Sequence, residues 1–246
     1  MLKVLKNEFI KMFKEKKFYI IAAILIGSII LMAFMKDPGI DAQNFVFETF
    51  AGMVIKPMLP AFMIIVISGV ITEDYVHGTM KFSLITPIKR RELIAGKFLF
   101  IYLYAVILLA ISFLTSYIVC VAVFGTSIQV QFMKNFLFNI KCYAYILLPL
   151  LSFCTLISFI AMFVNSIGEI IGIGLGIQFM TVIIEHSVKS AVYFLAGGGM
   201  YIYDFVRASG DLNNIHMLLV TLCACIYIAV FMLLSMAAMK KKDLVL

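Results

Sequence analysis

Residues 98–124 read FLFIYLYAVILLAISFLTSYIVCVAVF, a run that contains no charged residue. An unbroken apolar run of about 18 residues or more is long enough for a helix to cross the hydrocarbon core of a membrane. A strand that is half exposed to water would instead alternate apolar and polar residues, and this run does not. The stretch therefore predicts a membrane-spanning helix, and it sets the class of fold expected for the whole chain.

The composition of the chain agrees with a membrane protein. Of its 246 residues, 64% are hydrophobic and 13% are charged, and the mean hydropathy is +1.10. An ordinary soluble domain is about 45–50% apolar and about 25% charged, and one water-soluble core cannot hide the excess. These values exclude a soluble enzyme, a disordered protein and a collagen-like fibre. Because the alternation of an outer-membrane barrel is also absent, we expect an all-α integral membrane protein with a single domain over residues 1–246.

Six apolar runs predict six transmembrane helices, at about residues 18–35, 53–72, 98–124, 142–164, 167–184 and 215–239. Fourteen of the 20 lysines and arginines lie in the N-terminal segment, in the loop between the second and third runs, and at the C-terminus. Cytoplasmic segments carry the excess of Lys and Arg, so both termini are predicted to be cytoplasmic. The absence of Asn-x-Ser/Thr acceptors agrees with the plasma membrane of a bacterial cell.

Two segments outside these runs have their own character. In residues 1–17, helical spacing places apolar residues on one face and lysines away from it, which predicts an amphipathic helix lying on the cytoplasmic membrane surface. The apolar residues are Leu2, Leu5, Phe9, Met12 and Phe13. Its lysines would face anionic lipid headgroups, although the segment could also be only a basic flank of the first span. Residues 185–214 are glycine-rich yet partly apolar, and we expect an outer re-entrant segment between spans five and six.

The loop at residues 73–97 has the features of a short, rigid elbow under the membrane. Thr79 can cap a helix that Pro87 ends, and a second helix from about Arg91 should lead directly into the third span. Such an element suits the transmission of force from a cytoplasmic partner. An ordinary cytoplasmic loop that obeys the charge rule is the alternative.

This loop resembles a stretch of the type-2 ABC exporter permeases. That family carries the pattern E-x(4)-G-T, then P-[IV]-x-R-x-x-[IL]-x-x-K. Here the matching residues are Glu73, Gly78 and Thr79, then Pro87 and Ile88, Arg90 or Arg91, Leu93 and Ile94, and Lys97. The order of the predicted elements is also similar. In size, the chain resembles the small permeases for bacitracin resistance and lantibiotic immunity.

The resemblance implies a function and partners. It makes the loop a coupling helix that docks on an ABC ATPase subunit, with a docking surface formed by Glu73, Asp74, Tyr75, His77, Gly78, Thr79, Met80 and Lys81. Two copies of the ATPase would hold ATP and Mg, and the chain itself would bind no cofactor. A second permease copy, or a related permease chain, would complete the pore, and no nucleic acid is expected.

The sequence lacks an ATP-binding motif of its own. A P-loop needs G-x-x-x-x-G-K-[ST], because backbone amides, a lysine and a hydroxyl surround the phosphates and magnesium. The one Gly-Lys pair, Gly96-Lys97, is followed by Phe98 and has Arg91 where the first glycine would stand. ATP would therefore be hydrolysed on another polypeptide.

Several residues in the predicted spans are further candidates. Gly168, Gly172 and Gly176 form a helix-packing face that suits either a contact within the chain or a dimer or gating contact. Glu169 sits where a helix dipole favours an anion, or in the transport path. Gln178 is the most deeply placed strongly polar residue, and either lines that path or pairs across helices.

Lys56 and the remaining reactive side chains give weaker indications. Lys56 either extends toward the outer surface or binds an anionic or lipid-like substrate. The three histidines and five cysteines lack metal-ligand spacing, so no metal site is predicted. We therefore expect a transport subunit that clears or exports an amphipathic substrate such as a peptide antibiotic, lipid or drug. A sensor or immunity protein that needs no ATPase is the alternative, and a membrane enzyme is disfavoured because no catalytic set is present.

The charge distribution predicts how the loops are exposed. In a cysteine-free variant, single cysteines at positions 134 or 210 should react with an impermeant thiol reagent from outside the cell. A cysteine at position 89 should react only after permeabilisation, because the lysine-rich loop is placed in the cytoplasm. External labelling at position 89 would contradict the orientation.

Overall fold

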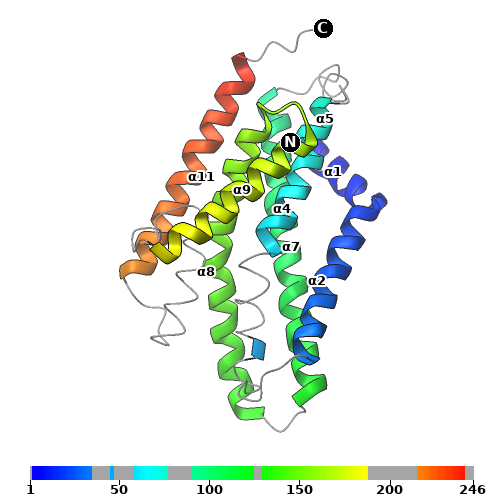
Figure 1. The fold of residues 1–246 in the computed structure, drawn as a ribbon, viewed down its shortest axis with the longest axis vertical. Coiled ribbons are helices and arrows are strands. Elements are labelled where there is room, and N and C mark those ends of the chain that lie inside the picture. The colour runs from blue at the N-terminus through cyan, green and yellow to red at the C-terminus, as the bar shows by residue number, and fades with distance from the viewer. Residues whose placement is uncertain are drawn as a thin grey trace.

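The computed structural model describes residues 2–34, 45–46, 58–76, 90–124, 129–187 and 215–241. These residues are almost entirely helical, and no strand occurs among them. Figure 1 shows long helices running roughly along one axis, with α1 set at an angle to them at one end. This arrangement confirms the all-α class predicted from the sequence.

The N-terminal region contains two helices separated by a bend at Glu15. Helix α1 spans Leu2–Lys14 and α2 spans Lys16–Phe34. The amphipathic helix expected over residues 1–17 is thus present as α1, although a different stripe is buried: Val4, Glu8 and Met12, each four residues apart. Phe9 also packs edge-on against Phe100 of α7, with ring centroids 5.2 Å apart. The membrane-surface location of α1 stays a prediction.

A continuous helical segment follows in three parts. Helix α4 spans Leu59–Ile67, the π-helical turn η2 spans Ser68–Thr72, and α5 spans Glu73–Val76. The π turn is marked by a bond from the Glu73 N–H to the Ser68 carbonyl, five residues earlier. Helix α4 is apolar on all sides, so it lies in the middle of the bundle, with Met63, Ile64 and Ile67 completely buried.

Helices α7 and α8 are the longest in the described chain. Helix α7 spans Arg90–Phe124, which confirms that the helix expected from about Arg91 leads directly into the third span. At 1.5 Å per residue its 35 residues extend about 52 Å, well beyond a hydrocarbon core of about 30 Å. Helix α8 spans Gln129–Ala161 and begins earlier than the fourth predicted span, because its first turns carry polar residues that an apolar window does not detect.

Helices α9 and α11 complete the bundle. Helix α9 spans Ile167–Ser187 and packs against α4 and η2, whereas α11 spans Ile215–Lys241 and packs chiefly against α8. In Figure 1, the end of α11 lies at the same end of the molecule as α1, α5 and the start of α7. The segments that the charge count assigns to one side of the membrane therefore gather at one end.

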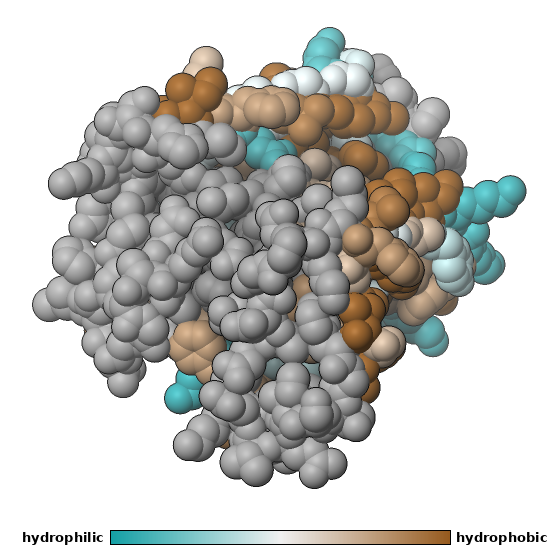
Figure 2. Space-filling view, turned by 60° about the horizontal axis from the view of Figure 1, so that its bottom comes forward, coloured by the Kyte–Doolittle hydropathy of each residue, from teal (hydrophilic) through white to brown (hydrophobic). Residues whose placement is uncertain are grey.

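Four described helices are long and apolar enough to cross a membrane: Lys16–Phe34, Arg91–Val123, Phe136–Ala161 and Met217–Met239. Leu59–Thr72 and Ile167–Thr181 are shorter apolar helices at the positions of the second and fifth predicted spans. Large apolar side chains such as Leu31, Ile118 and Leu233 are more than 60% exposed, and Figure 2 shows hydrophobic residues over much of the described surface. These features establish a membrane protein; the six-span count and its orientation stay predictions.

The glycines of α9 differ in their surroundings. A Cβ atom built on Gly174 would lie 2.8 Å from Cγ2 and 2.9 Å from Cγ1 of Ile64, so α4 approaches α9 closely there. Gly172 and Gly176 have no atom of the described residues within 4 Å of such a Cβ, and Gly168 has only Ser166 at 3.8 Å. Among the described residues, the close contact between α9 and α4 is thus made at Gly174. The other three glycines of α9 face away from that contact.

We predict that Gly174→Ala destabilises the bundle and that Gly172→Ala does not. The added methyl group meets both branches of the buried Ile64 side chain, so a change of rotamer cannot clear it, and overpacking of this kind costs about 1–3 kcal/mol. Thermal unfolding of both variants in detergent provides the measurement. Equal midpoints for the two variants would contradict the close approach of α4 and α9.

Candidate functional site

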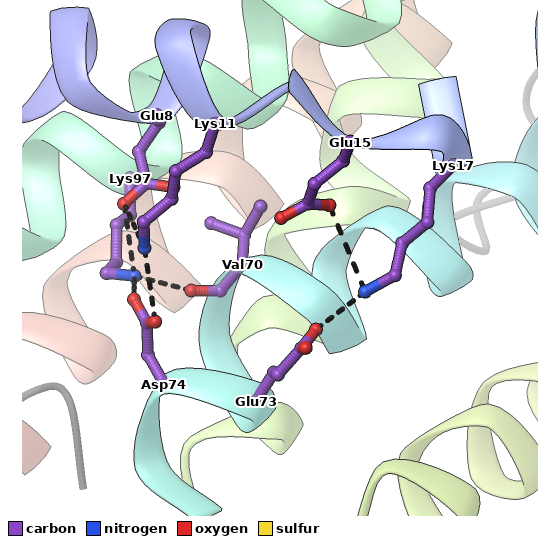
Figure 3. Close-up of polar contacts among 8 residues, drawn as sticks. All are labelled: Glu8, Lys11, Glu15, Lys17, Val70, Glu73, Asp74 and Lys97. Atoms are coloured by element: carbon purple, nitrogen blue, oxygen red, sulfur yellow. Dashed lines mark hydrogen bonds and ion pairs between the residues drawn. The ribbon is translucent and has the colours of Figure 1, made fainter. Parts of the chain in front are cut away.

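Four charged side chains from three separate helices meet where α1, α5 and α7 come together (Figure 3); we call them the buried ion cluster, formed by Glu8, Lys11, Asp74 and Lys97. Lys97 Nζ donates to the Asp74 carboxylate and lies 3.5 Å from Glu8 Oε1. Lys11 Nζ donates to Asp74 Oδ1 at 3.3 Å. The cluster therefore links the N-terminal helix to the start of the predicted elbow and to the base of α7.

Lys97 also donates to the backbone carbonyl of Val70, inside the π turn η2. The altered backbone pattern of a π turn is often associated with functional sites. Here it places a carbonyl beside the ammonium group that already contacts two carboxylates. Lys97 thus connects α7 to η2 as well as to α1 and α5.

Burial makes these contacts energetically important. Glu8 is 5% exposed and Lys97 is 3% exposed. A charge removed from water costs several kcal/mol unless counter-charges and hydrogen bonds replace its hydration. The cluster contains two carboxylates and two ammonium groups, so its formal charges balance. Separating the three helices would expose charges that each need a partner.

A second ion pair lies closer to water. Lys17 Nζ, near the start of α2, donates to Glu73 Oε2 at 2.8 Å and lies 3.9 Å from Glu15 Oε2. The side chains of Lys17, Glu73 and Glu15 are 53%, 32% and 49% exposed. Exposed pairs of this kind typically contribute about 0–1 kcal/mol, so we treat this pair as secondary to the buried ion cluster.

The electrostatic environment of Lys11 reflects its neighbours. Partial burial would lower the pKa of the Lys11 ammonium, but the nearby carboxylates of Glu8 and Asp74 outweigh that effect and raise the pKa above its ordinary value. Lys11 is therefore fully charged at neutral pH, as its place between two acids requires.

Two of the predicted docking residues belong to these ion pairs. Asp74 faces Lys97 and Lys11, and Glu73 faces Lys17. Tyr75 lies in α5, but its side chain is not among those described. The other predicted docking residues, His77, Gly78, Thr79, Met80 and Lys81, lie outside the described residues, as does Lys56. Glu73 and Asp74 thus contact helices α1, α2 and α7 of the chain itself.

The remaining candidates lie on α9, away from this cluster in the chain. Glu169 is exposed in the first turn of α9, as the sequence predicts for an acid at a helix N-terminus. Gln178 is buried, 7% exposed. The glycines Gly168, Gly172 and Gly176 lie on the outward side described above. A role of any of these residues in a substrate path or a dimer contact stays a prediction.

Sequence reasoning overlooked Glu8 and the part played by Lys97. Two signals were available. Glu8 lies midway between Val4 and Met12 at four-residue spacing, which puts an acid on a buried stripe of α1. Lys97 is flanked by Leu93, Ile94 and Phe98, and an isolated charge on an apolar face usually has a partner.

Comparison with known proteins identifies the family. Residues 4–185 match the family model described as ABC-2 family transporter protein. The match covers most of the chain, including the buried ion cluster, and the chain belongs to this family. It is therefore a membrane subunit of an ABC transporter, a class of protein that works with an ABC ATPase subunit. No curated protein matches the sequence.

We predict that Lys97→Met strongly destabilises the protein and that Lys17→Met does not. The first change leaves Glu8 and Asp74 without the ammonium that lies between them, and breaking a buried pair costs about 3–5 kcal/mol. The second removes an exposed pair worth about 0–1 kcal/mol. Both are measured as thermal unfolding midpoints of the purified chain in one detergent.

The two variants make the same chemical change and differ in burial. A Lys97→Met midpoint within error of the Lys17→Met midpoint would show that the buried ion cluster does not hold α1, α5 and α7 together.

Proposed function

We propose that this membrane subunit moves an amphipathic or hydrophobic substrate, such as a peptide antibiotic, a lipid or a drug, while a separate subunit hydrolyses ATP. Two copies of the permease, or this chain and a related one, would form the pathway, and two ATPase subunits would bind below. The protein would be located in the plasma membrane of a bacterial cell, with both termini of the chain in the cytoplasm. The substrate class rests on the resemblance to the small bacitracin-resistance and lantibiotic-immunity permeases.

The observation that carries the proposal is the connection made by Asp74. This residue stands at the start of the segment that resembles a coupling helix, and it contacts Lys97 of α7 and Lys11 of α1. A displacement of residues 75–81 would therefore pull on two helices of the membrane domain together. The buried ion cluster resists being opened because its charges would lose their partners, so the displacement is transmitted and not absorbed.

This geometry suggests that two parts of the elbow have different roles. Residues 75–81 would touch the ATPase, and Glu73 and Asp74 would join that docking segment to α2, α1 and α7. The helical continuity from α4 through η2 to α5 supports this division, because a continuous helix transmits displacement along its axis. Movement of the elbow would then tilt the helices around α4 and switch access between the two sides of the membrane.

Asp74→Asn is the sharpest test of the connection. The change keeps the shape of the side chain and removes the charge that Lys97 and Lys11 share. We expect the ATPase subunit to remain bound in normal stoichiometry, because the docking segment is intact. Hydrolysis stimulated by substrate should fall severalfold, because the ATPase is no longer linked to the bundle. Subunit stoichiometry and ATPase activity of the complex isolated from native membranes are the measurements.

Two further variants serve as comparisons for Asp74→Asn. Gly78→Val lies in the docking segment and should reduce the amount of ATPase that co-purifies. Lys14→Gln removes an exposed charge from α1 outside the cluster and should behave as wild type. Normal stimulation in Asp74→Asn would contradict the linkage, and isolation of the wild-type chain without any ABC ATPase would favour the sensor or immunity alternative.

A further inference from the structure

The two groups of ion pairs line one cavity. It has a volume of about 290 Å³ and lies between the α1–α2 bend, the segment from α4 to α5, and α7. Glu8, Lys11 and Asp74 line one side and Glu15, Lys17 and Glu73 the other; Figure 3 shows Val70 between the two groups. Phe18, Ile21, Val66, Phe100 and Tyr104 form apolar walls. We call this space the interfacial cavity.

The charges around the cavity favour a cation. Four carboxylates face it, and they are matched by the three ammonium groups of Lys11, Lys17 and Lys97, so one negative charge is in excess within this set of seven side chains. Glu15 is the most weakly held of these acids. Its ion contact in the described chain is Lys17 at 3.9 Å, beyond hydrogen-bond distance, and its side chain is 49% exposed. An incoming cation would meet Glu15 first.

The surroundings of the cavity would suit a cation that is attached to an apolar chain. The cavity is lined by residues of both α1 and α2, and the same two helices also carry exposed apolar side chains: Phe13 is 55%, Ile20 is 56% and Ile24 is 49% exposed. Aliphatic and aromatic surface of this kind on a spanning helix contacts acyl chains. A ligand whose polar end enters the cavity can thus lay its tail along α2.

The size of the cavity limits what enters. A cavity of about 150 Å³ holds one benzene molecule, and this cavity, at about 290 Å³, is about twice that size. That space accommodates a headgroup and the first part of a glycerol backbone, but not a whole lipid. A primary ammonium can donate three hydrogen bonds to carboxylates, whereas a trimethylated one can donate none. Lys17, which lies near both Glu15 and Glu73, would then turn to an adjoining phosphate while the ammonium of the ligand takes its place beside these two acids.

We propose that the interfacial cavity binds the headgroup of a phospholipid that carries a primary amine, with its ammonium at Glu15 and its phosphate near Lys17. The lipid would lie against the same elements that the buried ion cluster joins. The test of this assignment does not depend on transport, because it measures a lipid that is bound to the isolated chain in the absence of the ATPase.

The test compares two lipids on the purified full-length chain. The protein is delipidated in detergent and given equal amounts of dioleoylphosphatidylethanolamine and dioleoylphosphatidylcholine, and retained lipid is counted by native mass spectrometry. Wild type should prefer the amine lipid. Glu15→Gln should reduce that preference by about two- to fivefold, the range expected for one partly exposed ion pair. Glu92→Gln makes the same change at an exposed site in the first turn of α7 that does not line the cavity, and it should leave the preference unaltered.

A steric variant tests the cavity without removing a charge. A Cβ on Gly69 would lie 3.4 Å from Glu73 Oε2 and 3.7 Å from Lys17 Nζ, so Gly69→Leu directs a side chain into the cavity and should lower retention of the amine lipid. Equal retention of the two lipids by wild type would overturn the proposal, as would an unchanged preference in Glu15→Gln. Competition by dodecylamine as strong as that by phosphatidylethanolamine would overturn the role given to the phosphate.

Discussion

A lysine buried at the base of a membrane-spanning helix has to be matched by carboxylates from elsewhere in the chain. Lys97 satisfies this constraint by drawing Glu8 from α1, Asp74 from α5 and the Val70 carbonyl from η2 to one point. None of these partners is close to it in sequence, so the position of each helix depends on the others. The apolar packing of α4 holds the middle of the bundle together, but it does not determine where the charged ends of α1 and α5 lie.

This constraint also gives the N-terminal helix a role other than membrane contact. An amphipathic helix on a bilayer needs only an apolar face and a basic one. Helix α1 has both, and it adds an acid on the stripe that faces the bundle. It is therefore anchored by a specific polar contact as well as by the packing of Phe9 on Phe100. A displacement of α5 would therefore also act on α1.

Much of the fold could be predicted from the apolar runs, whereas the site could be predicted only in part. Residues 98–124 are charge-free and long, which identifies a spanning helix without ambiguity, and the helix expected from about Arg91 is α7, which begins at Arg90. The early start of α8 was missed, since polar side chains do not prevent a helix from continuing past a membrane. The close packing at Gly174 could not be recognised from spacing alone, because four-residue spacing selects Gly168, Gly172 and Gly176, and which face meets α4 is decided by tertiary structure. The partners of Asp74 come from distant segments, and no local pattern specifies them.

The π turn at Ser68–Thr72 has a consequence for how the chain tolerates changes of length. Relative to an α-helix, a single π turn contains one additional residue, and each residue of an α-helix turns the chain by about 100°. The directions of Glu73 and Asp74 are therefore offset from those that the buried face of α4 alone would give them. The five residues of this turn therefore help to set the directions in which Glu73 faces α2 and Asp74 faces α1 and α7. In a lineage of such proteins, the length of that turn would be under tighter restraint than the identity of most side chains around it.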